Sequence, residues 1–490
     1  MALLLWVAPA QAEWLRAESA NFIVFGNSSE SRLRERVELL EDFDRLLRMM
    51  TTVNDPPAPT KLHIYLVSGL DDLRLVRPVA TGVGGFYAAT PNGVAALVDS
   101  RAEAGGNEIL FHEYAHHFMM RYRPGAYPAW YVEGFAEYFM TARFRPQQVD
   151  FGTASRGRAY SITGMPWLSI DRVLFGDSSG LGREQMASFY ALSWLAVHYF
   201  YSTVERQAAL RRYLDGAEGG DPRAVFQRAT GLAPDQFDEE LRRYIRGRRI
   251  VSRRMTREPP APAPVAVMPL PRAADDLILY EVALRLGIPD ETGAAYLPRI
   301  RSLAARHAQD PFATRVLAHA ELLYGDPAAA DRLLDPLIEA SPDDAELLYL
   351  KGMRYLVAAE KADDNASDER LARQWFGRAH AADGNHFQTL YRYAQSLRGN
   401  TNFASENTRN VLLLAHSLAP QVSEIRMNTA ALLMSRGEYA EAETLLRPLA
   451  ADPHNAGIAR AAREMRELAL TRLRSAGGSE TTRAEAPDAE

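Results

Sequence analysis

The sequence contains no cysteine, which excludes disulfide bonds, thiolate metal sites and cysteine nucleophiles. It also has no basic excess. Its formal net charge of -6 argues against nucleic acid as the main partner, because neutralising phosphates needs surplus lysine and arginine. No stretch approaches the roughly 18 consecutive apolar residues of a membrane span, so we expect no span in the mature chain. Any metal site must therefore be built from histidine and carboxylate side chains.

The first twelve residues, MALLLWVAPAQA, combine a short apolar run with a small-x-small cleavage pattern at its end. The basic segment that usually precedes such a run is missing, because the first basic residue is Arg16. Either this signal is atypical or the true start lies upstream. We predict that residues 1–12 are a signal peptide and that the protein is exported, to the periplasm or outside the cell. In the alternative, the segment is a buried strand or helical turn of a cytoplasmic protein.

The segment Ile109–Arg121, ILFHEYAHHFMMR, contains a His-Glu-x-x-His pattern. His112 and His116 are four residues apart and share one face of a helix, so both imidazoles can reach a single zinc ion. Glu113 lies between them, where it can take a proton from a water molecule. A pattern this short also occurs by chance in unrelated sequences, so the surrounding sequence must support it.

A second helix over Ala129–Thr141, AWYVEGFAEYFMT, supplies that support. Glu133 follows His116 by 17 residues, with a turn between them, so the second helix can pack beside the first and offer a third ligand. Glu137 lies one turn further along the same face. There it can accept the second ring N–H of a liganding histidine and fix its tautomer.

The flanking sequence predicts a small sheet before this motif and helices after it. Strand patterns and one helix pattern precede the motif, whereas residues 150–182 look irregular and rich in glycine. The exception is 166–174, PWLSIDRVL, which is typical of a short strand or of a turn leading into a helix. The predicted elements are strands at 19–25 and 61–67, a helix at 29–50, a hairpin formed by 82–89 and 93–99, and helices at 183–202, 205–215, 221–230 and 234–246.

A proline-rich run, REPPAPAPVAVMPLPR, occupies residues 257–272 and predicts an extended linker. Beyond it the sequence is rich in alanine and leucine, helical in pattern, and interrupted by similar breaks. Successive breaks are 31, 41, 37 and 33 residues apart, which brackets the 34-residue tetratricopeptide period. These breaks are Asp310-Pro311, Ser341–Asp344, Asp383–Asn385, Ala419-Pro420 and Asp452-Pro453.

Taken together, the two helices resemble the gluzincin group of zinc metallopeptidases. The phrase Trp130–Phe139, WYVEGFAEYF, is similar to the W-x-x-E-G-x-A-E-Y pattern of bacterial peptidase-MA-like domains, which are often exported and sometimes carry tetratricopeptide repeats. The resemblance covers about Ser19–Arg246, but only His112–Phe139 is specific. It implies one zinc ion held by His112, His116 and Glu133.

The resemblance also implies roles for further residues. Glu113 would be the general base, and a tyrosine or histidine would donate to the oxyanion of the tetrahedral intermediate. Tyr190 and His198 are the candidates, although both can equally be core residues of an apolar helix. An edge strand upstream of the zinc helix would pair with an extended peptide, and Gly85, Phe86 and Tyr87 in the first hairpin strand, or the second strand at 94–99, would serve.

We therefore expect an α+β zincin-like N-terminal domain, with a small sheet plus helices, followed by an all-α tetratricopeptide-like helical solenoid. The expected segments are a signal peptide at 1–12, a metallopeptidase domain at 13–252, a proline-rich linker at 253–273, helical repeats at 274–474 and a disordered acidic tail at 475–490.

The expected function is zinc-dependent hydrolysis of peptide bonds, with the repeats binding the substrate or a partner protein. One alternative is a tetratricopeptide interaction scaffold whose peptidase-like domain binds zinc but is catalytically silent. A third possibility is hydrolysis of a non-peptide bond, which no residue excludes.

Overall fold

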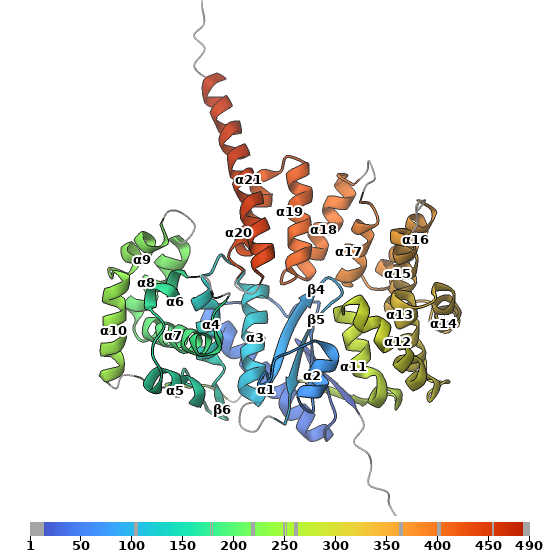
Figure 1. Ribbon diagram of the computed structural model, residues 1–490, viewed down its shortest axis with the longest axis horizontal. Helices are drawn as coiled ribbons and strands as arrows, with labels where there is room; N and C mark the ends of the chain where they lie inside the picture. Colours follow the sequence, from blue (N-terminus) through green and yellow to red (C-terminus); the bar gives the residue numbers. More distant parts are fainter. Residues whose placement is uncertain are drawn as a thin grey trace, which may run out of the picture. The chain divides into compact units, whose positions relative to one another are not determined.

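The computed structural model of the chain (Figure 1) contains two compact units, each built from two separate stretches of sequence. Unit 1 comprises Met1–Gly106 and Ala261–Val422, and unit 2 comprises Asn107–Pro260 and Ser423–Glu490. The predicted signal peptide, residues 1–12, lies outside the described residues. The structure describes residues 14–101, 106–176, 178, 180–216, 221–247, 250, 252–258, 263–361, 366–398, 403–452 and 455–483.

Unit 1 is built on a six-stranded mixed sheet in the order β4-β5-β3-β2-β1-β9. Strands β2, β3 and β5 are parallel, whereas β4, β1 and β9 run antiparallel to their neighbours. The predicted hairpin is present, with Thr90 opposite Gly93 at its turn. The strands are β1 (Leu15–Glu18), β2 (Phe22–Gly26), β3 (Leu62–Val67), β4 (Gly85–Thr90), β5 (Gly93–Asp99) and β9 (Ala266–Pro269).

Helices cover the sheet because its strands carry apolar residues on both faces. Helix α1 (Glu30–Thr51) begins at Ser29, whose side chain accepts from the N–H of Arg32 and caps the first turn. Helices α2 (Leu70–Val76) and α11 (Ala273–Leu286) share an apolar core with the sheet. That core includes Trp14, Tyr65, Leu73, Leu97, Ile278 and Val282.

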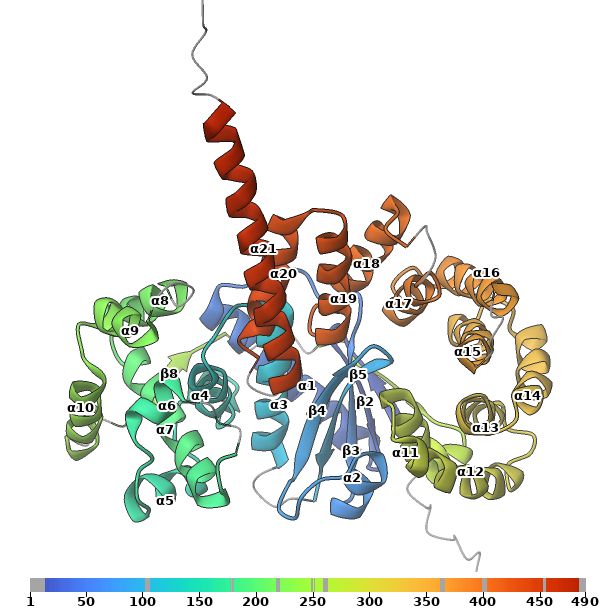
Figure 2. The same cartoon turned by 45° about the horizontal axis from the view of Figure 1, so that its top comes forward.

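After α11 the chain forms a curved array of packed helices in unit 1. Figure 2 shows α11, α13, α15 and α17 along the inner side of the curve and α12, α14 and α16 along the outer side. The predicted breaks at Asp310, Ser341 and Asp383 fall between helices. The helices are α12 (Asp290–Ala305), α13 (Pro311–Tyr324), α14 (Pro327–Ala340), α15 (Ala345–Lys361), α16 (Ala366–Ala382), α17 (Phe387–Gln395) and α18 (Glu406–Leu418).

Unit 2 contains the two motif helices, α3 (Gly106–Tyr122) and α4 (Ala129–Phe139), together with the apolar helix α7 (Arg183–Tyr201). Helices α4 and α7 pack closely, and a small antiparallel sheet has the order β6-β7-β8. The other elements are β6 (Arg143–Arg145), β7 (Gln148–Phe151), β8 (Arg253–Thr256), α5 (Arg156–Gly164), α6 (Ile170–Phe175), α8 (Val204–Gly216), α9 (Pro222–Thr230), α10 (Pro234–Arg246), α19 (Ser423–Ser435), α20 (Tyr439–Ala450) and α21 (Ala456–Arg483).

The structure differs from three of the predicted segments. Two parts of the predicted linker at 253–273 are strands: β8 pairs with β7 and β9 pairs with β1. The predicted disordered tail at 475–490 begins inside α21, which continues to Arg483, and residues 484–490 lie outside the described part. The stretch 150–182, predicted to be irregular apart from 166–174, contains the end of β7 and the short helix α5, neither of which was expected. The short helix α6 lies in the part where a short strand or a turn leading into a helix was predicted.

Within the ranges that the structure describes, no helix combines the length and the apolar character that a membrane crossing requires.

Candidate metal centre

The His-Glu-x-x-His motif lies in the middle of α3, and its two histidines point toward α4. Apolar side chains anchor the helix in the core, because Phe111, Ala115 and Phe118 are almost completely buried. On α4 every residue from Trp130 to Phe139 is buried, so its two glutamates are held inside the protein. The local sequence therefore forces charged side chains into the space between two apolar helices.

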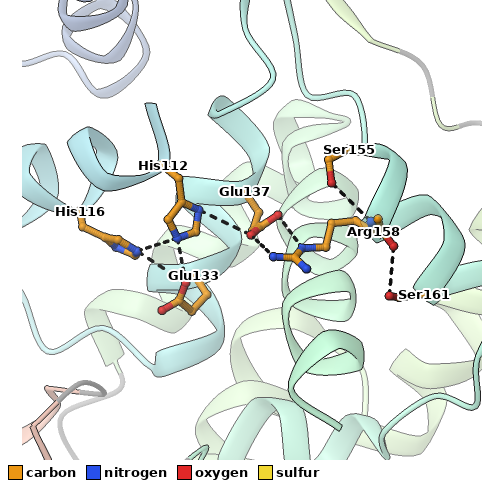
Figure 3. A network of polar contacts seen from close by, with 8 residues as sticks. His112, His116, Glu133, Glu137, Ser155, Arg158 and Ser161 are labelled. Atoms are coloured by element: carbon orange, nitrogen blue, oxygen red, sulfur yellow. Dashed lines mark hydrogen bonds and ion pairs between the residues drawn. The ribbon is translucent and has the colours of Figure 1, made fainter. Parts of the chain in front are cut away.

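Three of the predicted ligand atoms meet in this space. His116 Nε2 lies 3.1 Å from His112 Nε2, and Glu133 Oε2 lies 3.5 Å from each of these nitrogens. Figure 3 shows the two imidazoles and the carboxylate turned toward one another. Among the described residues, these three form the group of histidine and acidic side chains that is arranged to hold a metal ion.

The spacing of these atoms fits a tetrahedral zinc site. Zinc binds imidazole nitrogen and carboxylate oxygen at about 2.0–2.1 Å, so two ligand atoms of a tetrahedral site lie about 3.3 Å apart. The observed distances of 3.1 and 3.5 Å are close to that value. Two nitrogens and one oxygen would occupy three corners and leave the fourth open, which is the pattern of catalytic rather than structural zinc sites.

Negative charge dominates the surroundings of His112. Burial alone would lower the pKa of this histidine, but Glu133, Glu137 and Glu113 outweigh it and raise the pKa to about 9. Glu113 is half-buried on α3, next to His112 in the sequence. The excess of carboxylates over cations favours a divalent cation in the cluster.

Glu137 lies on the opposite side of the His112 ring from His116 and Glu133 (Figure 3). Its Oε1 is 3.5 Å from His112 Nδ1. That Glu137 fixes the imidazole tautomer stays a prediction. Arg158 of α5 binds the same carboxylate with both arms of its guanidinium, at 2.8 and 2.7 Å. Figure 3 shows the continuous path from Arg158 through Glu137 to His112.

Tyr190 of α7 lies beside the cluster, with its ring centroid 6.4 Å from that of His112. Burial and the charges of Glu133 and Glu137 raise the pKa of its phenol, so the hydroxyl stays protonated at neutral pH. The other candidate donor, His198, is buried elsewhere on α7. There its Nδ1 lies 2.9 Å from the hydroxyl of Tyr244.

His117 follows His116 in the sequence but belongs to the core. Its ring stacks on Tyr114, and burial lowers its pKa to about 3. The predicted substrate strand lies in unit 1, where Gly85, Phe86 and Tyr87 form part of β4 at one end of the strand order. Its role in binding a peptide stays a prediction.

The sequence reasoning missed Arg158 because it lies in the stretch that we expected to be irregular. The usable signal was Ser155, whose hydroxyl accepts from the N–H of Arg158, three residues later, and caps α5. That cap marks a helix start, but nothing in the sequence indicates that Arg158 would face Glu137.

Comparison with known proteins gives little further information. A scan against protein families and a search of curated proteins found no match. Among solved structures, one that matches is a thermophilic tetratricopeptide-repeat protein from Thermus thermophilus. It is 18% identical over 39% of this chain and 91% of its own length, with a TM-score of 0.30. A likeness this weak carries no information about function.

Proposed function

We propose that the protein is a zinc-dependent hydrolase of peptide bonds. The observation that carries this proposal is the meeting of His112 Nε2, His116 Nε2 and Glu133 Oε2 at the spacing of a tetrahedral site. Zinc in that position would act as a Lewis acid on the scissile carbonyl and lower the pKa of water. A buried set of two imidazoles and one carboxylate, with a further glutamate beside it, suits this chemistry better than a purely structural role.

Three further side chains have separate roles in the proposed reaction. Glu113 takes the proton of the attacking water and passes it to the leaving amine, which makes it the general base and then the general acid. Glu137 holds the imidazole of His112 in the tautomer that presents Nε2 to the metal. Tyr190 donates its hydroxyl proton in a hydrogen bond to the oxyanion that develops on the substrate carbonyl.

Other parts of the chain contribute to the proposal as binding surfaces. The edge strand β4, with Gly85, Phe86 and Tyr87, would pair with an extended peptide. The curved helical array of unit 1 would bind the substrate or a partner protein, since such arrays present extended surfaces. Export to the periplasm or outside the cell belongs to the same proposal and rests on residues 1–12.

The second candidate function is an interaction scaffold with a catalytically silent zinc domain. The helical array from α11 to α18 favours it, because an array of this kind binds proteins without any chemistry. Glu113 favours the hydrolase instead, since a scaffold needs no carboxylate beside its metal ligands. Hydrolysis of a non-peptide bond would use the same residues and is separated from peptidase activity by the choice of substrate.

The test combines metal analysis with proteolysis of an unfolded protein. We expect one zinc per chain, and we expect Glu113→Gln to keep the zinc while activity falls by about 10²–10⁴-fold. Glu184→Gln changes an exposed glutamate on α7 in the same way and serves as the matched control. Equal activity in Glu113→Gln would contradict the mechanism, whereas zinc without activity on any peptide would favour the scaffold.

A further inference from the structure

The guanidinium of Arg158 contacts two side chains of the candidate centre, Glu137 and Tyr190. Its Nε and one terminal nitrogen donate to the two oxygens of Glu137, at 2.8 and 2.7 Å. The same group lies over the ring of Tyr190, with its central carbon 4.8 Å from the ring centroid. Arg158 comes from α5, Glu137 from α4 and Tyr190 from α7, so one side chain connects three helices.

Glu137 needs this partner because it is among the most buried carboxylates of the described residues. Its side chain is 1% exposed, and a buried carboxylate without a cation would carry a cost of several kcal/mol. Each oxygen of the carboxylate accepts one hydrogen bond from this guanidinium, and the two parallel bonds fix the plane of the carboxylate. Consequently the orientation of Glu137 is set by Arg158 rather than by solvent.

The fixed carboxylate in turn determines how His112 is presented. With Oε1 of Glu137 3.5 Å from Nδ1 of His112, a proton on Nδ1 is favoured and the lone pair of Nε2 is left for the metal. A rotated Glu137 would give up this contact and allow the imidazole to turn. The contact of the guanidinium with the ring of Tyr190 also restricts the orientation of that tyrosine beside the same site.

We propose that Arg158 is a positioning residue for the zinc site, acting through Glu137 on the ligand His112 and through ring contact on Tyr190. This inference rests on the proposed function, because it assumes that His112 binds zinc. A positioning role for Arg158 differs from that of a purely structural ion pair in what its replacement changes. Replacing Arg158 must change the metal site itself, in affinity and in coordination geometry, and not only the stability of unit 2.

The first measurement is zinc affinity, by competition with a chelator, in the full-length protein. We expect Arg158→Met to weaken zinc binding by about 10–100-fold, the usual effect of losing a residue that supports a ligand. Arg158→Lys keeps the positive charge but loses the two-pronged geometry, so we expect an intermediate loss. Arg158→Lys also preserves the charge balance of the core, which allows the test even if Arg158→Met does not fold.

The second measurement is the visible absorption spectrum of the protein loaded with Co²⁺, which reports ligand geometry without any turnover. We expect the band intensities of Arg158→Lys to differ from those of the unmodified protein. The matched control is Arg223→Met, which removes an equally two-pronged arginine pair, with Asp171 of α6, in the same unit. This control should leave both zinc affinity and the Co²⁺ spectrum unchanged.

The two hypotheses fail in different ways. An unmodified protein that takes up no zinc would contradict the proposed function. An unmodified protein that binds zinc, together with a folded Arg158→Lys variant of equal zinc affinity and identical Co²⁺ spectrum, would overturn the role of Arg158 alone. The role of Arg158 is supported if both Arg158 variants bind zinc more weakly and Arg223→Met binds it as tightly as the unmodified protein.

Discussion

Tyr190 lies beside the candidate metal centre and can donate a hydrogen bond to a group bound there. Its ring meets that of His112 edge to face, and Glu113 and Glu133 add to the burial that raises the pKa of its hydroxyl. A phenol that remains protonated can only donate toward a developing negative charge. Tyr190 therefore has the correct protonation state for stabilising an oxyanion at neutral pH.

We expect Tyr190→Phe to lower kcat by about 10²–10³-fold, the usual cost of removing one oxyanion donor. KM and zinc content should change little, because the ring and its contacts with Arg158 and His112 are retained. Steady-state kinetics on an unfolded protein substrate provides the measurement. Tyr160→Phe, at a largely exposed tyrosine of α5, is the control and should behave as the unmodified protein does. An unchanged kcat in Tyr190→Phe would remove this residue from the mechanism.

For single residues, the sequence predicted which side chains would lie together, but not which of two oxyanion-donor candidates would lie beside them. Helical spacing alone indicates that His112 and His116 share a face, and the structure places their Nε2 atoms together. Tyr190 and His198 are both on α7, and their positions along the chain favour Tyr190 without any motif that excludes His198. Only the packing of α10, which brings Tyr244 to His198, separates them, and such a long-range contact has no local signal.

At the scale of elements, the centre depends on how closely α4 approaches α7. Gly134 follows the proposed ligand Glu133, and a β-carbon added there would lie 2.4 Å from the carbonyl oxygen of Ser193 and 2.7 Å from Val197. Backbone cannot yield as a flexible side chain can, so any larger residue would push the helices apart. Packing therefore requires glycine at position 134, next to the glutamate that we propose as a metal ligand.

We expect Gly134→Ala to lower the free energy of unfolding by about 1–3 kcal/mol, the typical cost of overpacking a dense core. Zinc affinity should fall as well, because α4 carries both Glu133 and Glu137. Urea unfolding and chelator competition are the two measurements. Gly157→Ala on α5 is the matched control: its added β-carbon would meet no atom within 4 Å, so neither quantity should decrease. Equal unfolding midpoints for the two variants would contradict the packing argument.

The pattern of apolar residues predicted the long elements and missed the short ones. Helices α3, α4 and α7 follow the predicted ranges closely because each has several turns of periodic apolar residues. Helix α5, which has nine residues and few apolar ones, has too weak a pattern to be recognised. The same weakness hid Arg158, and with it the support behind Glu137.

At the scale of the whole molecule, each compact unit combines two stretches that are far apart in the sequence. Strand β9 returns to pair with β1, and the N–H of Leu270 donates to the carbonyl oxygen of Trp14 at 2.8 Å. Proline-rich sequence tolerates this position because an edge strand can lose donors on one side. A linear division at the proline run therefore separates α11 from the sheet that it covers. The proline run marks where the sequence becomes rich in alanine and leucine, but it does not divide the chain into its two compact units.

The inner side of the helical array in unit 1 is occupied by internal polar contacts. Arg285 of α11 pairs with Glu281 and with Glu346 of α15, at 3.2 and 3.0 Å. The β4–β5 turn also meets this side, where Arg392 of α17 donates to the side-chain oxygen of Asn92. Part of the surface that such arrays offer to partners is thus used to hold the protein's own hairpin.

Two half-buried histidines lie in this charged region, and their titration links its stability to pH. Burial, with Arg285 as a further contributor, lowers the pKa of His63 on β3 and of His319 on α13 to about 4, from 6.5. Above pH 6.5 both are neutral whether the chain is folded or unfolded. Between pH 6.5 and 4 the unfolded chain binds protons that the folded chain resists, so stability is lost as the pH falls.

We expect this loss to reach about 1–3 kcal/mol for each histidine near pH 4, at 1.36 kcal/mol for each unit of pKa shift. The double variant His63→Gln, His319→Gln should show a smaller decrease in the free energy of unfolding between pH 6.5 and 4 than the unmodified protein, because amides do not titrate. Urea unfolding across that range gives the comparison. His380→Gln, at an exposed histidine of α16, should keep the unmodified slope. If the double variant keeps it too, the acid sensitivity of unit 1 must come from its carboxylates, and the two histidines are not held neutral by the fold.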